Sequence, residues 1–455
     1  MATDPDTDLT SRRHFLRRCV AGGAALAFSA GITADAPDAG TPGTTSIDTA
    51  VSDAVVPGTD VTPQKLASDE TFWNRVRQLY PLPDSLIHLE HGNWGMMSGA
   101  VMTHYEQETR RVNQYTSYYG RQDFAGEQAA VMQQLALWLN VAPSELVLVR
   151  NATEALSSLI SGYNRLRAGD SVLYADLDYS SMQGLMNSLR ERRNVTVETL
   201  NIPEPATRES ILDVYEAALQ ANPRIRLVLL THISHRTGLL LPIAELSELA
   251  TRYGADVIVD SAHAIGQVDF TLPDLKADFV GLNLHKWVGA PLGLGLMYVR
   301  KERFMDIDRH PVRGGGTGSD SNLHDRVGVG TSNLAATMSI PKALELHLAI
   351  GAQHKQARLR WLRDRWAETL RADSRFEILT PPDPALYAGI TSFRLRGQTD
   401  SASNIELARR LLHDHRIFTV QRDGIHSGSC VRVTPAPFNS AEEMDALTEA
   451  LRRIA

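Results

Sequence analysis

Apolar and polar positions follow two recurring patterns from about residue 63 onwards. Short runs rich in Val and Leu, such as Asp256–Asp260 and Phe279–Leu284, predict buried parallel strands, because such strands are covered on both faces. Longer stretches between them carry apolar residues three or four positions apart, which predicts amphipathic helices. Strands and helices that alternate to about residue 300 indicate a doubly wound, mostly parallel α/β sheet. Two further strands of this kind are expected at Leu146–Val149 and Ser171–Ala175.

The pattern changes towards both ends of the chain. The stretch Lys342–Ala372 predicts one long helix that leads into a smaller C-terminal α+β domain, and Pro63–Pro81 has a helical pattern of its own. Residues 37–62 are rich in Thr, Asp, Pro, Gly and Ala without apolar periodicity, which predicts a disordered linker. We therefore predict an N-terminal segment and large domain over residues 63–345, and a small domain over residues 346–455.

Composition narrows the class of protein. With 455 residues, 43% of them hydrophobic, the chain can bury a large core. A net charge of −7 argues against nucleic acid or an anionic membrane as a partner. Of the two cysteines, Cys19 lies near the N-terminus and Cys430 near the C-terminus.

Charged and polar side chains follow two of the predicted strands. Asp260 and His263 come at the end of the first, and His285 and Lys286 at the end of the second. Because a parallel α/β sheet binds ligands at the carboxyl ends of its strands, we expect these groups to lie together. A lysine that forms a Schiff base and a carboxylate that keeps a pyridine nitrogen protonated are the groups needed to bind pyridoxal phosphate. The alternative is a strand-end Asp that caps a helix and an unrelated surface Lys.

The first 36 residues are predicted to be a twin-arginine signal peptide. Ser11–Leu16 has the sequence SRRHFL, and the apolar run Cys19–Ile32 that follows is too short to span a bilayer. Cleavage is expected after Ala34 or Ala36. The mature form would then have no internal disulfide and no membrane anchor. We expect export to the periplasm, by the twin-arginine machinery, of a folded enzyme with its cofactor bound; the alternative is a cytoplasmic enzyme with a chance Arg-Arg pair.

With these motifs in this order, the chain resembles class V aminotransferases of the fold-type I pyridoxal-phosphate superfamily, and among them the isopenicillin N epimerase-like branch. The resemblance covers roughly residues 65 to 450. The signal and fold together are also similar to those of periplasmic enzymes that tailor pyoverdine siderophores. The resemblance implies a large doubly wound sheet domain, a smaller C-terminal α+β domain, bound pyridoxal 5′-phosphate and a homodimer.

The resemblance assigns roles to the residues at the strand ends. Asp260 matches the partner of the pyridinium nitrogen, and His263 the residue near the phenolic oxygen of the cofactor. His285 matches a phosphate contact and Lys286 the Schiff-base lysine. Once released, the Lys286 amine is expected to be the general base that moves the Cα proton.

Two further segments resemble parts of the cofactor site. The turn Val149–Ala155 resembles the phosphate-binding turn, in which the N–H groups of Ala152 and Thr153 and the Thr153 hydroxyl meet the phosphate at the positive end of a helix. A plain helix cap would use the same residues. Tyr179 occupies the place of the aromatic residue that stacks on the pyridine ring, although it could be an ordinary half-buried tyrosine.

Two glycine-containing segments bear on assembly. Gly314–Gly316 and Gly330–Asn333 resemble segments that reach the phosphate of the neighbouring subunit's cofactor. Thr331 would then act across a dimer interface. The alternative is a pair of ordinary glycine loops.

The substrate side is assigned from two other motifs. Within His91–Gly95, which resembles a loop that lines the active site, Asn93 and Trp94 are candidate substrate contacts. Arg432 aligns with the arginine that binds the substrate α-carboxylate, a task that suits the fork of a guanidinium group. The alternative is a strand arginine that points to solvent.

One departure from the family restricts the chemistry. Cysteine desulfurases carry a nucleophilic cysteine shortly before that arginine, where this chain has Arg422–Gly428 with Ser427 near the cysteine's place. Since a serine cannot carry a persulfide, desulfuration by that route is not expected. Cys430 is expected to be a small core residue.

The reaction itself is open at this level. One base, Lys286, favours transamination, in which the proton moves from Cα to the cofactor. Epimerisation needs a second acid or base, for which Tyr179, His91 and His235 are candidates, and a C–S or β-lyase reaction is a third possibility. A different class is an exported binding protein without catalysis, which would not need a Schiff-base lysine. The amine acceptor and the substrate, small or peptide-like, are not specified, and no metal is expected.

Overall fold

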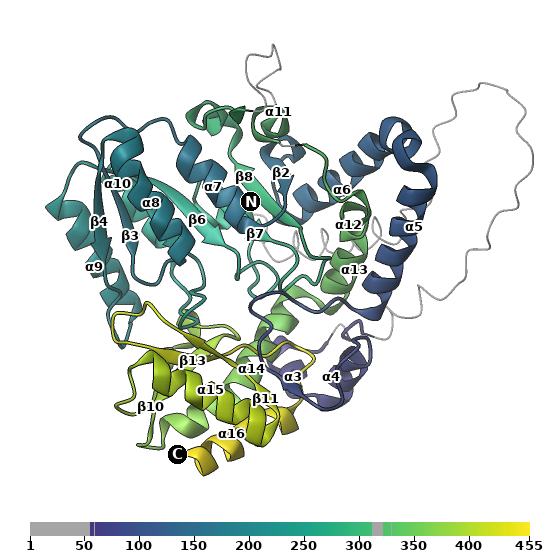
Figure 1. Cartoon of the computed structure of the whole chain (residues 1–455), viewed down its shortest axis with the longest axis vertical. Coiled ribbons are helices and arrows are strands. Elements are labelled where there is room, and N and C mark those ends of the chain that lie inside the picture. Colours follow the sequence, from purple (N-terminus) through teal and green to yellow (C-terminus); the bar gives the residue numbers. More distant parts are fainter. Residues whose placement is uncertain (1–54, 59, 312–321, 329) are drawn as a thin grey trace, which may run out of the picture.

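The computed structural model describes residues 55–58, 60–311, 322–328 and 330–455 (Figure 1). Its centre is a seven-stranded sheet in the order β2-β8-β7-β6-β5-β3-β4, in which β8 alone runs antiparallel to its two neighbours. The large, mostly parallel sheet predicted from the sequence is therefore confirmed. The strands are β2 (Leu146–Val149), β3 (Ser171–Ala175), β4 (Thr196–Leu200), β5 (Ile225–Thr231), β6 (Asp256–Ser261), β7 (Phe279–Asn283) and β8 (Gly295–Val299).

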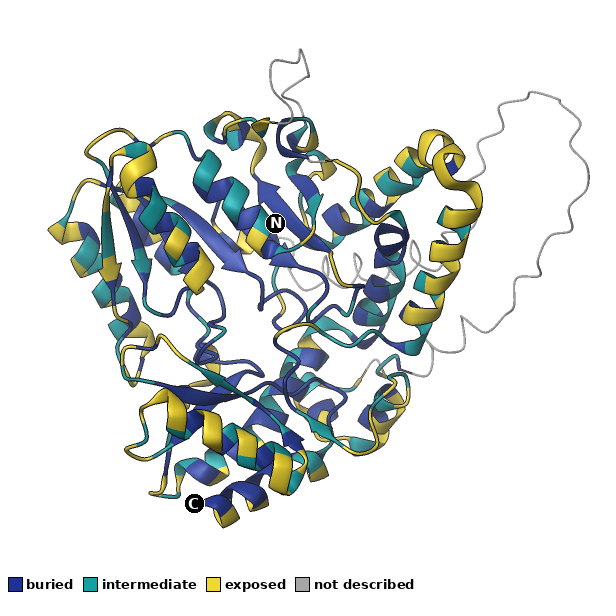
Figure 2. Cartoon of the chain, in the orientation of Figure 1, coloured by how far each residue is buried: buried dark blue, intermediate teal, exposed yellow. Residues whose placement is uncertain are grey.

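Helices cover both faces of this sheet, and its central strands are buried, whereas the edge strand β4 is largely exposed or half-buried (Figures 1 and 2). Successive strand residues point to opposite faces. Ile258 and Phe279 pack against the helices of one layer, whereas their neighbours Val259 and Val280 pack against the other. This explains why the strands are continuous apolar runs. One layer contains α7 (Ala152–Gly162), α8 (Ser180–Arg193) and α11 (Leu323–Val327); the other contains α6 (Phe124–Leu139), α9 (Arg208–Ala221) and α10 (Ile243–Arg252).

The C-terminal part forms a smaller α+β unit, as predicted. Its antiparallel sheet has the order β12-β13-β10-β9 and packs with three helices around Trp366 and Phe393. The positions of the domain boundaries stay predictions. The elements are β9 (Phe376–Ile378), β10 (Thr391–Leu395), β12 (Val420–Arg422), β13 (Cys430–Val433), α14 (Ala352–Arg371), α15 (Ser401–His415) and α16 (Ala441–Ile454), and a separate two-stranded sheet pairs β1 (Ile87–His88) with β11 (Ile417–Phe418).

The single long helix predicted for Lys342–Ala372 is wrong. The structure has two helices, α13 (Ile340–Ile350) and α14, which are separated by Gly351. Gly351 has φ of 90°, a left-handed conformation that other residues adopt rarely, and it ends α13. The connection between the two domains is thus bent. Two further helices, α5 (Gly99–Gln122) and α12 (Leu334–Met338), pack beside α13.

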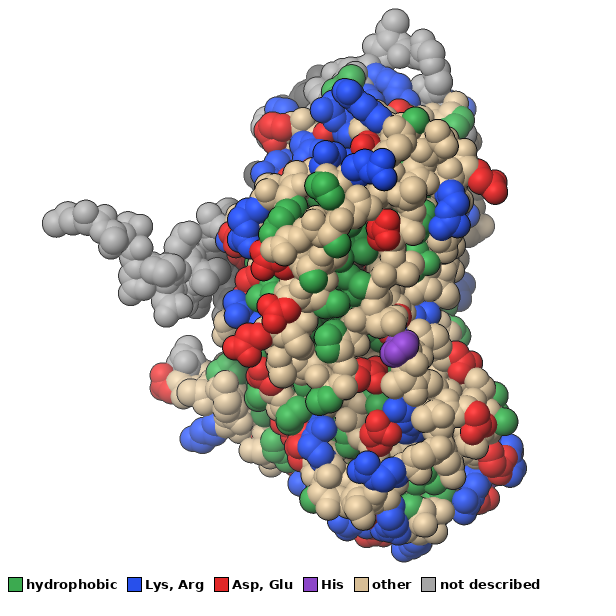
Figure 3. Space-filling model, turned by 90° about the vertical axis from the view of Figure 1, so that its left-hand side faces the viewer, with side chains coloured by type: hydrophobic (Ala, Val, Ile, Leu, Met, Phe, Trp, Pro, Cys, Tyr) green, Lys and Arg blue, Asp and Glu red, His purple; other side chains and the backbone are tan. Residues whose placement is uncertain are grey.

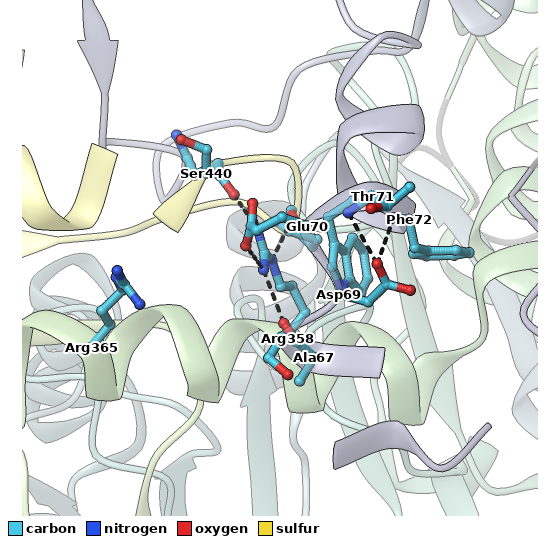
Figure 4. A network of polar contacts seen from close by, with 12 residues as sticks. Ala67, Asp69, Glu70, Thr71, Phe72, Arg358, Arg365 and Ser440 are labelled. Carbon is cyan, nitrogen blue, oxygen red and sulfur yellow. Dashed lines mark hydrogen bonds and ion pairs between the residues drawn. The ribbon is translucent and has the colours of Figure 1, made fainter. Parts of the chain in front are cut away.

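The N-terminal segment is held against the small domain by a buried arginine. The predicted helical stretch after Pro63 forms two short helices, α3 (Pro63–Ala67) and α4 (Glu70–Arg77). The Arg358 guanidinium donates to the Glu70 carboxylate at 2.5 and 3.2 Å and to the Ala67 carbonyl at 2.9 Å (Figure 4). It also donates to the Asn439 carbonyl at 2.8 Å. One side chain on α14 thereby joins α3, α4 and the segment before α16.

The predicted disorder of residues 37–62 does not extend to the end of that range. Val55 is 1% exposed and packs with Phe72 and Trp73. Burial of an apolar side chain of this size outweighs the polar composition of its neighbours. The predicted signal peptide and the rest of the predicted linker up to residue 54 lie outside the described residues.

Within the described ranges, no helix is both long and apolar enough to cross a bilayer. On the face shown in Figure 3, acidic and basic side chains are mixed, with a group of Lys and Arg near the upper end.

Candidate active site

A cavity of about 780 Å³ lies at the carboxyl ends of the central strands, with the small domain on its other side. Its size is within the usual range for sites that bind small molecules or cofactors. Asp260, His263, His285 and Lys286 all line it. The four side chains that the sequence placed at two strand ends are therefore together. Several cavity residues were not predicted: Asn151, Asn283, Arg236 and Arg422.

Asp260 places a buried carboxylate on the cavity wall. It is 5% exposed, and its Oδ1 accepts the Ala262 N–H at 2.9 Å. Burial raises the pKa of Asp260, while the Ala262 hydrogen bond and the nearby Lys286 act in the opposite direction. A buried carboxylate in this position is stabilised by a positively charged partner inside the cavity.

Lys286 is buried and lies beside His263. Its Nζ is 3.1 Å from His263 Nε2, and the Trp287 Nε1–H donates to His263 Nδ1 at 3.4 Å. Because Nδ1 accepts, Nε2 carries the ring hydrogen and donates to the amine. Burial lowers the pKa of Lys286 to about 7, and the positive charge of Arg432 adds to this effect. Burial also keeps the pKa of His263 well below its usual value. At neutral pH, Lys286 is therefore a free amine in a large fraction of the molecules, and this is the form that acts as a nucleophile or base.

The start of α7 and His285 form the other end of the cavity. The Asn151 side chain caps the helix by accepting the Glu154 N–H at 2.8 Å, and Thr153 lines the cavity. The Ala152 N–H, predicted to meet a phosphate, donates to Asn283 Oδ1 at 2.8 Å in this structure.

His285 donates from Nδ1 to the Leu294 carbonyl at 2.7 Å, which leaves Nε2 for a ligand. Thr153, the helix N-terminus and His285 are thus the groups best placed for an anion.

Tyr179 and His235 contact each other at the cavity mouth. Their rings meet edge to face with centroids 5.1 Å apart. Burial, together with Arg236 and Arg432, lowers the pKa of His235, so its ring is neutral. His91, the third candidate for a second acid or base, packs between His88 and Phe438 and does not line this cavity. The structure therefore brings two of the three candidates to the site.

The loop His91–Gly95 packs directly on the backbone around Lys286. The Gly95 N–H donates to the His285 carbonyl at 2.8 Å. A Cβ atom on Gly95 would lie 1.8 Å from the Lys286 carbonyl oxygen. Asn93 lines the cavity as predicted, whereas Trp94 does not line it and is 52% exposed.

Arg432 lines the cavity from β13, but it already has a carboxylate partner. Its side chain is 1% exposed, Nη2 donates to Glu90 Oε1, and Nη1 donates to the His235 carbonyl at 2.6 Å. The alternative of a solvent-facing arginine is wrong, because the Arg432 side chain is buried and lines the cavity. Glu90 was not predicted, since no local spacing connects it with a residue so far along the chain.

Other predicted residues lie elsewhere. Thr331 is exposed and does not line the cavity, and Gly314–Gly316 lies outside the described residues. Ser427 accepts hydrogen bonds from Arg394 at 2.9 and 3.2 Å. Cys430 is fully buried, and burial raises its pKa to about 12, in keeping with a core residue. Among the described residues, no cluster of His, Cys, Asp and Glu could hold a metal ion.

Known proteins are similar to this chain over most of its length. The family model "Aminotransferase class-V" matches residues 99–447. Isopenicillin N epimerase of Streptomyces clavuligerus is 27% identical over 401 residues, which cover 83% of this chain and 97% of the epimerase. A cysteine desulfurase of Pectobacterium carotovorum is 28% identical over 346 residues, which cover 71% of this chain and 81% of that protein. The solved structure of the cysteine desulfurase CsdA from Escherichia coli has a TM-score of 0.71 at 20% identity and covers 84% of this chain and 98% of its own.

Proposed function

Because the chain belongs to the class-V aminotransferase family, we propose that it reacts at the Cα of an amino acid or of a substrate that bears one, and that the reaction is transamination. The family is one of pyridoxal 5′-phosphate enzymes, and this is the cofactor of the protein. The observation that supports the proposal most strongly is the contact of Lys286 Nζ with His263 Nε2 in a cavity that Asp260 also lines.

The residues present fit the cofactor. Lys286 would hold it covalently, Asp260 would face its pyridine nitrogen, and Thr153 and His285 would hold its phosphate. Tyr179 lies at the mouth, where an aromatic ring could cover the cofactor. When bound, pyridoxal phosphate withdraws the electrons of a bond to Cα.

Proton transfer is the task left to the chain. A free Lys286 amine can accept the Cα proton, and the His263 Nε2–H orients that amine at 3.1 Å. The same lysine can then deliver the proton to a neighbouring carbon without help from a second residue. A single mobile base of this kind supports transamination.

Epimerisation is a second candidate, since Tyr179 and His235 also reach the cavity. Epimerisation would require one of them to return a proton on the face opposite to Lys286. The similarity to isopenicillin N epimerases over most of the chain also favours it. Incubation with L-amino acids in D₂O, followed by chiral chromatography, distinguishes the two reactions. Deuterated D-amino acid supports epimerisation, and a keto acid supports transamination.

The test of the proposed function is the absorption spectrum of the cofactor-loaded protein before and after addition of L-glutamate. We expect the band of the bound cofactor to bleach and 2-oxoglutarate to appear in equal amount. Lys286→Ala should abolish both changes, while Lys276→Ala, at an exposed lysine paired with Glu248, should leave them unchanged. Bleaching that also occurs in Lys286→Ala would contradict the role of the lysine.

We also propose export and dimer formation. The SRRHFL motif supports export by the twin-arginine route, and replacement of Arg12 and Arg13 by lysine should keep the protein in the cytoplasm. Thr331 is proposed to contact the cofactor of the other subunit, in keeping with its position outside its own cavity. Sedimentation analysis of the purified protein tests the dimer.

A further inference from the structure

Two arginines of the small domain meet at one carboxylate beside the cavity. Arg422 ends β12, and Arg432 lies on the neighbouring strand β13. The Nη2 atoms of both donate to the same oxygen, Oε1 of Glu90. Both arginines line the cavity. The structure therefore offers two guanidinium groups to a substrate carboxylate, and the two are held very differently.

Arg432 is the firmly held member of the pair. It is buried, and its Nη1 and Nη2 already donate to the His235 carbonyl and to Glu90. Glu90 is fixed in turn, because its Oε2 accepts the Thr434 hydroxyl at 3.0 Å. A buried ion pair is costly to separate, since each charge would lose its partner in a place that water does not reach. A substrate carboxylate at the Nη2 atom of Arg432 would compete with Glu90 for that donor.

Arg422 is the loosely held member. Its side chain is 29% exposed, and its hydrogen bonds to Glu90 and to the Gln421 carbonyl are both 3.4 Å long, at the limit of such bonds. The Nε atoms of both arginines are buried without a hydrogen-bond partner, so the two side chains differ in their exposure and in the contacts of their Nη atoms. Arg422 can therefore turn towards a ligand and lose little.

The other charged groups on this wall are engaged elsewhere. Arg236 donates to the backbone carbonyls of Asp176 and Gly424, which fixes the segment that carries Arg422. Asp423 accepts the Ser401 hydroxyl at 2.6 Å. Arg236 therefore has other acceptors than a substrate carboxylate, and Asp423 has a donor other than Arg422.

We propose that Arg422 binds the carboxylate of the substrate, while Arg432 stays paired with Glu90. This inference rests on the proposed reaction at the Cα of an amino acid. It assigns a specificity role to a residue other than the arginine of the family motif. It also predicts that the preferred substrates carry a free carboxylate next to the reacting carbon.

The test compares L-alanine with L-alaninamide, which share the amine and the reacting Cα–H and differ in the carboxylate. The steady-state rate of reaction at increasing concentrations gives kcat and KM for each compound. Loss of a charge-assisted hydrogen bond weakens binding by about ten- to a hundredfold. Arg422→Gln should raise KM for L-alanine by that factor, with a smaller change in kcat, and should leave L-alaninamide unaffected.

Matched variants separate this role from a structural one. Arg422→Lys should restore part of the preference for L-alanine, because it restores the charge. Arg410→Gln removes a loosely held, 41% exposed arginine on α15 and should change nothing. If Arg422→Gln keeps the wild-type preference, the carboxylate is bound by Arg432 and the proposal is wrong.

A binding measurement keeps the test independent of turnover. Propionate should bind the cofactor-loaded protein more tightly than propionamide, and Arg422→Gln should remove the difference. If neither alanine compound reacts but propionate binding depends on Arg422, the proposed reaction fails and the carboxylate site stands. If propionate binds equally well to Arg422→Gln, the carboxylate site fails.

Discussion

Gly95 lies in the loop His91–Gly95, which contacts the backbone of Lys286. The variant Gly95→Ala tests how closely the site depends on that contact. The added Cβ would lie 1.8 Å from the Lys286 carbonyl oxygen, so the two segments must move apart by about 1.6 Å to reach an ordinary contact of 3.4 Å. The next nearest atoms are the carbonyl carbon and Cα of Lys286, so backbone atoms and not a flexible side chain would have to move.

Both stability and activity should respond. Overpacking of this kind typically costs about 1–3 kcal/mol of unfolding free energy. A displacement of about 1 Å at a reacting group reduces rates on the order of a hundredfold. Urea unfolding measures the first effect, and the bleaching rate of the bound cofactor with amino acid measures the second.

Gly184→Ala is the matched control. Gly184 lies in α8, and a Cβ there meets no atom within 4 Å. Because alanine is a better helix former than glycine, this variant should gain about 0.5–1 kcal/mol with an unchanged rate. The unfolding free energy of Gly95→Ala could instead lie within about 0.5 kcal/mol of the wild-type value, with a wild-type rate. The loop is then not packed on Lys286 as described.

Three further outcomes are expected. Glu70→Ala leaves the buried Arg358 without its carboxylate and should lower the free energy of unfolding by about 1–3 kcal/mol in urea titrations; an unchanged midpoint would mean that the network does not hold the N-terminal segment. In the cofactor-free protein, acylation of Lys286 should rise with pH around a midpoint near 7, because its pKa is lowered and only the free amine reacts. Peptide mass spectrometry after timed labelling measures this midpoint, and a midpoint near the ordinary lysine pKa of about 10.4 would refute the electrostatic description of the site. Cys430 should resist thiol reagents at pH 8 until the protein is unfolded, because its thiol is buried and its pKa is raised to about 12; rapid labelling in the native state would contradict its place in the core.

The sequence predicted the central sheet well because its signals are local. β2 and β3 begin and end where the short apolar runs Leu146–Val149 and Ser171–Ala175 do. The break at Gly351 was missed, because the apolar spacing continues on both sides of it and a glycine inside a helical pattern does not by itself reveal a left-handed φ.

In the site too, features with local signals were predicted and long-range contacts were missed. Asp260 and Lys286 could be placed together because both follow buried strands of one sheet, and the sheet brings strand ends to one edge. The ion pair between Glu90 and Arg432 joins residues that are 342 positions apart, through the pairing of two domains. No periodicity encodes such a contact. Arg422 was overlooked for the same reason, since its exposure and weak bonds appear only once β12 and β13 are paired.

The central claim is that Lys286 holds the cofactor and serves the reaction. The most direct measurement is reduction of the cofactor-loaded protein with borohydride, followed by digestion and mass spectrometry of the lysine peptides. We expect the mass of the reduced cofactor on Lys286 and on no other lysine. A cofactor fixed to a different lysine, such as Lys355 on α14, or a protein that binds the cofactor without any reducible link, would contradict the account.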